Sequence, residues 1–317
     1  MKKRFTAISM PLRLLALSAC FILPTIGSAQ DKPPEFVATR LSGTVTMLKG
    51  QGGNVGISAG EDGVYIIDDQ VQPVTQQLLA EIRKISDRPI RFIINTHHHA
   101  DHVGGNEAIG GTGAIIVAHD NVYQRMSTRQ FNNFLNETTE PWAAGALPVI
   151  TFSDRITLHL NGEDVTVIHV ANGHTDGDAI IHFPVSNVIH MGDIYFNGLY
   201  PFIDLDSGGS LQGILAGVEL ALTMTNKDTR IIPGHGPVST PTELTAYRDF
   251  LLQAQANVQA LIDQGKSLEE VIAAKPTAQW DDALGQTWIK PAQMVTFIYN
   301  SLTGVHEFTR IKANTQE

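Results

Sequence analysis

Short apolar runs and alternating apolar and polar positions occur in two successive stretches of the chain, which predicts two groups of β-strands. The first group covers residues 36–41, 43–50, 63–69, 91–95 and 114–118. The second covers residues 149–152, 156–160, 165–170, 179–183, 188–191 and 230–233. Apolar spacing near a helical period predicts helices over 74–85, 211–224, 244–265, 267–274 and 292–302, and the polar segment 119–136 is also predicted to be helical. Two β-rich halves with a helical tail predict an α/β fold in which sheets are sandwiched between helices.

Before the first predicted strand, residues 1–29 have the parts of an export signal. A basic start precedes an apolar run over 14–26, and small residues at Gly27 and Ala29 fit a cleavage site. The run is too short to remain as a stable transmembrane anchor. A second interpretation makes Cys20 the lipid-bearing cysteine of a lipoprotein. Apolar residues continue past Cys20, which favours a soluble bacterial protein exported to the periplasm or secreted.

The charge of the chain limits the classes of partner that it can bind. Its 317 residues have a formal net charge of −10, and because the leader contains four cations and no acid, the mature chain would be at −14. Such an acidic surface argues against nucleic acid or an anionic membrane as a partner. The single cysteine of the sequence, Cys20, lies in the leader, which excludes disulfides and thiolate metal sites from the mature protein.

The segment 96–102 has the sequence Thr-His-His-His-Ala-Asp-His and follows a predicted strand directly. Alternate side chains of an extended chain share a face, so His97 and His99 are expected to point together and His98 away from them. Asp101 and His102 follow a turn and can face the same cavity from another angle. Imidazole and carboxylate groups together suit zinc, iron or manganese. Taken alone, the segment would also fit a solvated histidine-rich loop.

Three later residues, His174, Asp193 and His235, also follow predicted strands, and a glycine precedes each of them. Glycine permits a tight turn that aims the next side chain across the edge of a sheet. Seven nitrogen and oxygen ligands exceed the needs of one tetrahedral ion and match a two-metal site. The first predicted ion has the ligands His97, His99 and His174, the second has Asp101, His102 and His235, and Asp193 bridges the two.

Further residues are candidates for supporting roles. Asp68 ends a predicted strand, and it either hydrogen-bonds a ligand histidine or is an ordinary strand-end carboxylate. Substrate-facing loops are predicted at 126–148 and 195–205. Tyr195 would either donate a hydrogen bond to a substrate oxygen or pack in the core. The first loop has aromatic residues that would wall an apolar pocket or pack inward, namely Phe131, Phe134 and Trp142.

The combined motifs resemble those of the metallo-β-lactamase superfamily. They occur in the family's order, as His97-x-His99-x-Asp101-His102, Asn172-Gly173-His174-Thr175, Gly192-Asp193 and Pro233-Gly234-His235-Gly236. The resemblance covers about residues 36–240 and implies an αββα sandwich with two zinc ions, iron or manganese being the alternatives. It divides the chain into a signal peptide at 1–29, a catalytic domain at 30–240 and a C-terminal helical extension packed on it at 241–317.

This resemblance implies an exported hydrolase of a small molecule. A hydroxide that bridges the two ions would attack an acyl carbon, and Asp101 would be the catalytic residue that relays a proton to the leaving group. The expected substrates are a β-lactam-like amide, a lactone, an ester or a thioester. The family's β-lactamases have cysteine or serine at the position of Asp193, which argues against true β-lactamase activity. The alternatives are an enzyme similar to the mono-iron sulfur dioxygenases and a non-catalytic metal-binding accessory protein.

Overall fold

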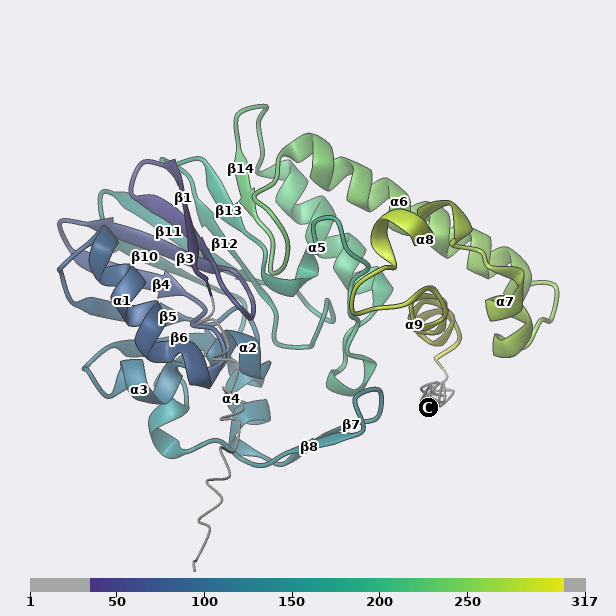
Figure 1. The fold of residues 1–317 in the computed structure, drawn as a ribbon, viewed down its shortest axis with the longest axis horizontal. Helices are drawn as coiled ribbons and strands as arrows, with labels where there is room; N and C mark the ends of the chain where they lie inside the picture. The colour runs from purple at the N-terminus through teal and green to yellow at the C-terminus, as the bar shows by residue number, and fades with distance from the viewer. Residues whose placement is uncertain (1–34, 305–317) are drawn as a thin grey trace, which may run out of the picture. The chain divides into compact units, whose positions relative to one another are not determined.

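The computed structural model describes residues 35–304, so the predicted signal peptide and the last residues of the chain lie outside the described part. Within residues 35–304, two β-sheets face each other and helices cover both outer faces (Figure 1). This arrangement confirms the predicted αββα sandwich and the helices that follow it. In the same residues, no helix combines the length and the apolar character needed to cross a membrane.

The larger sheet has seven strands in the order β1-β2-β3-β4-β5-β6-β9, and neighbours are antiparallel up to β4 and parallel from β4 onward. Its strands are β1 (Val37–Ser42), β2 (Val45–Lys49), β3 (Val55–Gly60), β4 (Gly63–Ile67), β5 (Ile90–Ile94), β6 (Ile115–His119) and β9 (Ile150–Phe152). The smaller sheet runs in chain order and ends in a parallel pair. Its strands are β10 (Arg155–Leu160), β11 (Glu163–His169), β12 (Ala179–Phe183), β13 (Val188–His190) and β14 (Arg230–Ile232).

The helices fall into two groups along the chain. The first group lies among the strands of the larger sheet: α1 (Thr75–Ile85), α2 (Ala100–Val103), α3 (Asn106–Gly110) and α4 (Asp120–Ser127). The second group follows β13: α5 (Leu211–Thr223), α6 (Pro241–Ile262), α7 (Leu268–Ala274), α8 (Ala278–Leu284) and α9 (Pro291–Thr303). Short 3-10 helices connect these elements: η1 (Gln72–Val74), η2 (Ala144–Ala146), η3 (Gly192–Ile194) and η4 (Leu205–Ser207).

Alternation along the central strands sorts the apolar side chains into layers. In β4, Tyr65 and Ile67 pack between the two sheets, whereas Val64 and Ile66 pack under α1. The same period of two places Ile181 of β12 between the sheets and its neighbour Ile180 against the second group of helices. Continuous apolar runs are therefore needed in these strands because both of their faces are buried.

The C-terminal helices share one core with the outer face of the smaller sheet. A single cluster of buried residues extends from the sheet through α5 and α6 to α9. At its edge, Phe297 of α9 contacts Phe202 and Phe134, with ring centroids 5.6 and 4.9 Å apart. The segment 195–205, which follows Asp193, is thus packed directly against α9.

The structure corrects the prediction of a helix up to residue 136. The helix α4 ends at Ser127, and a hairpin follows, with strands β7 (Gln130–Asn132) and β8 (Glu137–Thr139). Asn136 takes a left-handed conformation at the turn, with φ 53°, which asparagine tolerates better than most residues. The strand β3 and the short helices α2, α3 and α8 were also not predicted. The sequence of β3, Val-Gly-Ile-Ser-Ala-Gly, contains two glycines, and glycine is disfavoured in strands.

Loss of the α9 contact should destabilise the whole described part of the chain. Because Phe297 is fully buried, Phe297→Ala should lower the free energy of unfolding by about 3–5 kcal/mol. The control Leu252→Ala, on an α6 side chain that is 46% exposed, should change it by less than about 0.5 kcal/mol. Urea unfolding followed by circular dichroism measures both values. Equal effects of the two variants would contradict a shared core.

Candidate metal centre

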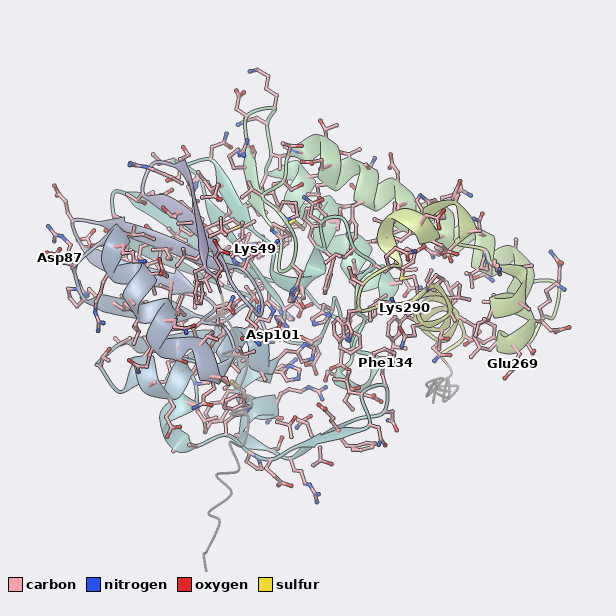
Figure 2. The ribbon with its side chains drawn as sticks, in the orientation of Figure 1. Lys49, Asp87, Asp101, Phe134, Glu269 and Lys290 are labelled. Atoms are coloured by element: carbon pink, nitrogen blue, oxygen red, sulfur yellow. The ribbon has the colours of Figure 1, made fainter. Side chains whose placement is uncertain are left out.

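All seven predicted ligands lie where strands end, and the structure brings them together. His97 and His99 follow β5, while Asp101 and His102 lie in α2, directly after them. The other three come from the smaller sheet: His174 from the connection between β11 and β12, Asp193 from η3 after β13, and His235 from the turn after β14. Figure 2 labels Asp101 in α2. Two sheets therefore contribute to one cluster.

Three imidazoles and one carboxylate form the first group of this cluster. The Nδ1 atom of His99 lies 3.2 Å from Nε2 of His97 and 2.9 Å from Nε2 of His174. The Oδ2 atom of Asp193 lies 3.9 Å from Nε2 of His97 and 3.6 Å from Nε2 of His174. These four residues offer ligand atoms that lie close enough together to hold one metal ion.

Asp101, His102 and His235 form the second group. The Oδ2 atom of Asp101 lies 3.2 Å from Nε2 of His235 and 3.5 Å from Nε2 of His102. Asp193 also contacts this group, because its Oδ1 atom lies 3.2 Å from His102 Nε2 and its Oδ2 atom 3.4 Å from His235 Nε2. One carboxylate thus faces both groups, which is the geometry of the predicted bridge.

Hydrogen bonds on the far side of each ring determine which nitrogen faces the cluster with a lone pair. In neutral histidine one ring nitrogen donates and the other accepts. His174 Nδ1 donates to the carbonyl oxygen of Phe202 at 2.8 Å, and His99 Nε2 donates to Oδ2 of Asp204 at 2.9 Å. Their other nitrogens, 2.9 Å apart, therefore both carry lone pairs toward the cluster, and such a pair requires a cation or proton between them.

Asp68 fixes two more imidazoles in the same way. It accepts hydrogen bonds from Nδ1 of His102 at 2.7 Å and from Oγ1 of Thr96 at 2.8 Å. Because that hydroxyl donates to Asp68, it accepts from Nδ1 of His97, 2.9 Å away. Both rings then direct Nε2 into the cluster. Of the two predicted roles for Asp68, the structure shows the hydrogen bond to a ligand candidate.

The charges of the cluster favour a bound cation. Burial lowers the pKa of His174 to about 4, and burial together with His102 lowers that of His97 well below its usual value, so both rings are neutral near pH 7. Burial also lowers the pKa of His235, but the carboxylates of Asp193 and Asp101 outweigh it and raise the value to about 9. Nε2 of His102 and Oδ1 of Asp193 are buried without a hydrogen-bond partner among the described residues. A divalent ion would satisfy these atoms, so the donor set fits a metal.

The glycines before the ligands are required for two different reasons. Gly192 has a positive φ of 51°, which permits the turn that was predicted. Gly173 and Gly234 lack a positive φ, but a Cβ atom would collide with Oδ2 of Asp178 at the first and with Oδ1 of Asp193 at the second. Close packing, rather than backbone conformation, requires glycine at these two positions.

Some functional side chains were not found from the sequence. Asp204 is 2% exposed and orients His99, but a single aspartate inside a predicted loop has no distinguishing signal. Phe196 stacks on the ring of His235 with centroids 5.2 Å apart.

Tyr195 is buried and its hydroxyl lies 2.8 Å from Oγ of Ser239, so the core interpretation of this residue is correct. His98 points away from the cluster, as predicted, and its Nε2 lies 3.4 Å from Oγ of Ser207.

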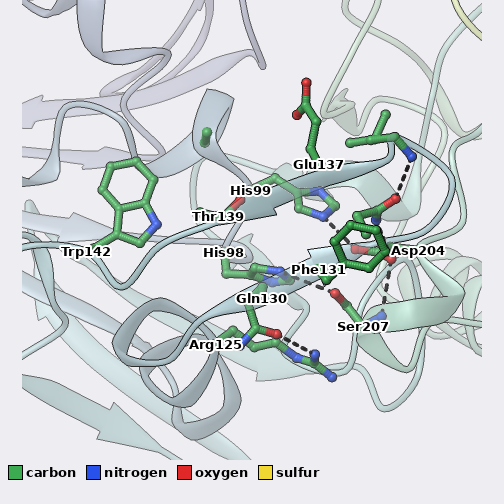
Figure 3. Close-up of a pocket in the computed structure, with 13 residues that line it drawn as sticks. His98, His99, Arg125, Gln130, Phe131, Glu137, Thr139, Trp142, Asp204 and Ser207 are labelled. Carbon is green, nitrogen blue, oxygen red and sulfur yellow. Dashed lines mark hydrogen bonds and ion pairs between the residues drawn. The ribbon is translucent and has the colours of Figure 1, made fainter.

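A cavity lies beside the first group of candidate ligands (Figure 3). His98 and His99 form one part of its wall, and Phe131 and Trp142 from the predicted substrate loop form another. Phe134, the third aromatic residue of that loop, lies in the turn of the hairpin and packs instead against Phe202 and against Phe297 of α9. The loop thus supplies both predicted roles, one pocket wall and one core contact.

Asp68→Asn should weaken metal binding without changing the fold. Asparagine tolerates the left-handed backbone at this position (φ 62°), but its single accepting oxygen cannot serve both Thr96 and His102. Apparent metal affinity, measured by competition with a chelator, should fall by about 10–100-fold. The control Asp228→Asn, on an exposed ion pair with Lys227, should leave affinity unchanged. Unchanged affinity in Asp68→Asn would contradict the positioning role.

Comparisons with known proteins agree with this geometry. A hydroxyacylglutathione hydrolase from Polaromonas sp. (strain JS666 / ATCC BAA-500) is 25% identical over 182 residues, which cover 56% of this chain and 61% of the relative. The alpha subunit of 2,4-dinitroanisole O-demethylase from Nocardioides sp. (strain JS1661) is 24% identical over 141 residues, 44% of this chain and 40% of the relative. The chain thus spans less than two thirds of the length of these curated relatives.

Solved structures show the same fold at low sequence identity. A metallo-beta-lactamase from Pontibacter korlensis has a TM-score of 0.57 and 18% identity over 69% of this chain and 99% of its own. A sec-alkylsulfatase from Pseudomonas sp. has a TM-score of 0.64 and 15% identity over 86% of this chain and 51% of its own. The family model of the metallo-beta-lactamase superfamily matches residues 42–235, which contain all seven clustered residues. The chain therefore belongs to the metallo-beta-lactamase superfamily.

Proposed function

We propose that this chain is an exported hydrolase that holds two divalent cations, zinc in the first instance, and cleaves an acyl bond of a small molecule. The observation that carries the proposal is the convergence of imidazole lone pairs and two carboxylates on one cluster. Membership of a superfamily that includes many hydrolases supports it. Hydroxyacylglutathione hydrolases occur repeatedly among the relatives, which supports an acyl substrate such as a thioester.

The two groups of residues would hold one ion each. His97, His99 and His174 would bind the first ion, Asp101, His102 and His235 the second, and Asp193 would contact both. Cations bound there would polarise a substrate carbonyl and lower the pKa of a water molecule to about 7. The carboxylate of Asp193 faces both groups of residues. This arrangement favours two bound ions over the single iron of a sulfur dioxygenase.

The protein's own side chains would direct the approach of the substrate and the movement of protons. His99, Asp101 and His235 are 20–32% exposed, whereas the other members of the cluster are buried, so the substrate would approach over these three side chains. The carboxylate of Asp101 is 32% exposed, and we propose that it accepts a proton there and passes it to the leaving group. Asp204 and Asp68 would hold the rings of His99 and His102 in place during the reaction.

His97→Ala should remove both metal and activity. The purified wild type should contain about two zinc ions per chain, and the variant should lose at least one. Hydrolysis of a panel of one β-lactam, one lactone and one thioester should fall by more than about 100-fold, because Lewis-acid contacts contribute several kcal/mol. Elemental analysis and initial rates measure the two effects.

The matched control is His159→Ala, because His159 is an exposed histidine outside the cluster, 76% accessible. It should retain full metal content and full activity, and both variants should have the circular dichroism of the wild type. Full activity of His97→Ala would contradict the ligand assignment. A wild type with one iron and oxygen uptake on a persulfide would favour the dioxygenase, and bound metal with no turnover of the panel would favour the accessory protein.

The export proposal has a separate test. Expressed in a Gram-negative host, the protein should be recovered from the periplasm with Gln30 as its first residue, because cleavage should follow Ala29. N-terminal sequencing and intact mass identify this end. A lipid-modified chain that begins at Cys20 would support the lipoprotein interpretation instead.

A further inference from the structure

The cavity beside His99 is built from three separate segments of the chain. The hairpin β7–β8 supplies one wall, α2 and the residues before it supply another, and η4 closes the third side. Figure 3 shows Trp142 and Phe131 on opposite sides, with His98 and His99 between them. Because His99 is also a member of the metal cluster, anything bound in the cavity lies next to the reacting centre.

The hairpin is tied to the metal cluster through one carboxylate. The Oδ2 atom of Asp204 accepts a hydrogen bond from Nε2 of His99, and its Oδ1 atom accepts one from Nδ2 of Asn132, both at 2.9 Å. The next hairpin residue, Asn133, donates its backbone and side-chain N–H groups to Asp206, both at 2.7 Å. These bonds fix the distance between the hairpin wall and His99, so the cavity has a defined width.

The walls of the cavity supply no free arginine or lysine to an anionic guest. Among its lining residues the one arginine, Arg125, is already occupied, since it makes two hydrogen bonds to Asp176 and one to Gln130. Glu137 lines the cavity from β8 and Asp204 from the segment before η4, and neither adds a cationic group. An anionic group would therefore lose its hydration in the cavity without gaining a free guanidinium or ammonium partner.

The size and the apolar walls of the cavity limit the guest further. Phe131 and Leu135 are 52% and 39% exposed, and together with Trp142 they present apolar surface to the cavity. Its volume is about 70 Å³, about half of the ~150 Å³ that accommodates benzene in an engineered apolar cavity. A short alkyl group of a few carbons fills this space, and a longer chain has to extend beyond it.

We propose that this cavity binds the acyl substituent of the substrate and selects short, uncharged alkyl groups. This inference rests on the proposed hydrolase function and adds the substrate class to it. In the reaction, the oxygen of water bonds to the acyl carbon, the bond to the leaving oxygen, sulfur or nitrogen breaks, and the leaving group takes a proton. The products are a short carboxylic acid and the protonated leaving group.

A series of p-nitrophenyl esters tests the size of the cavity, because only the acyl chain varies. In the wild type, kcat/KM should be highest for the butanoate and at least about 10-fold lower for the octanoate. Phe131→Ala widens the cavity and should raise the ratio of octanoate to butanoate by about 10-fold. Thr139→Phe places an aromatic side chain on β8, where such residues are tolerated, and fills the cavity from that side. This variant should lower kcat/KM for the butanoate relative to kcat/KM for the acetate.

The matched control is Tyr123→Ala, which removes another exposed aromatic side chain (42%) outside the cavity lining. This variant should keep the wild-type profile of chain lengths. The p-nitrophenyl hemisuccinate, which carries a carboxylate on the acyl group, should react at least about 10-fold more slowly than the butanoate. A flat profile, or equal profiles in Phe131→Ala and Tyr123→Ala, would overturn the cavity proposal while leaving a metal-dependent hydrolase intact.

A binding measurement separates failure of the cavity proposal from failure of the hydrolase proposal. If metal-loaded wild type hydrolyses none of these esters, the hydrolase proposal fails for them, and the cavity is judged by titration with butyramide. Tryptophan fluorescence should then change saturably, and Trp142→Phe should remove the change because Trp142 lines the cavity. Octanamide should bind at least about 10-fold more weakly. A signal that does not saturate would overturn the cavity proposal as well.

Discussion

The facing lone pairs of the imidazoles are the interaction on which this structure depends. Nitrogen atoms 2.9–3.2 Å apart on His97, His99 and His174 repel one another unless positive charge lies between them. Each ring is nevertheless held in this orientation by a hydrogen bond on its far side. Holding these lone pairs together therefore lowers the stability of the metal-free protein. A bound metal ion would remove the repulsion, and its binding free energy would stabilise the fold.

The supports of these rings come from distant parts of the chain. Phe202 and Asp204 belong to the segment after Asp193, and α9 packs against Phe202 through Phe297. The helices beyond Pro241 thus contribute to the orientation of His174 without supplying a ligand to the cluster. The family match ends at residue 235 and therefore leaves out α9, although α9 packs against Phe202, whose carbonyl group orients His174.

The sequence was sufficient for the layers of the fold and for the members of the cluster, and it was insufficient for the contacts that orient them. Buried apolar runs and strand-end histidines are local signals, so they could be found without a structure. Asp204 could not be identified, because its role arises from a meeting with His99 across 105 residues. The hairpin at 130–139 was mistaken for helix, since its polar sequence has no marked period and its strands have three residues each. The reason for Gly234 was also beyond the sequence, because the crowding comes from Asp193 on another strand end.

The shared carboxylate of Asp204 has a consequence for how this protein can diverge. Its two oxygens join Asn132 of the hairpin to His99, so a change of Asn132 would disturb the orientation of His99 in the candidate metal cluster together with the shape of the cavity. The side chains of Phe131 and Leu135 flank this link without taking part in it, although the backbone N–H of Leu135 donates to Oδ1 of Asn132 at 2.9 Å. These two side chains can therefore be exchanged, by evolution or by design, to reshape the cavity while the bonds that orient His99 stay as they are.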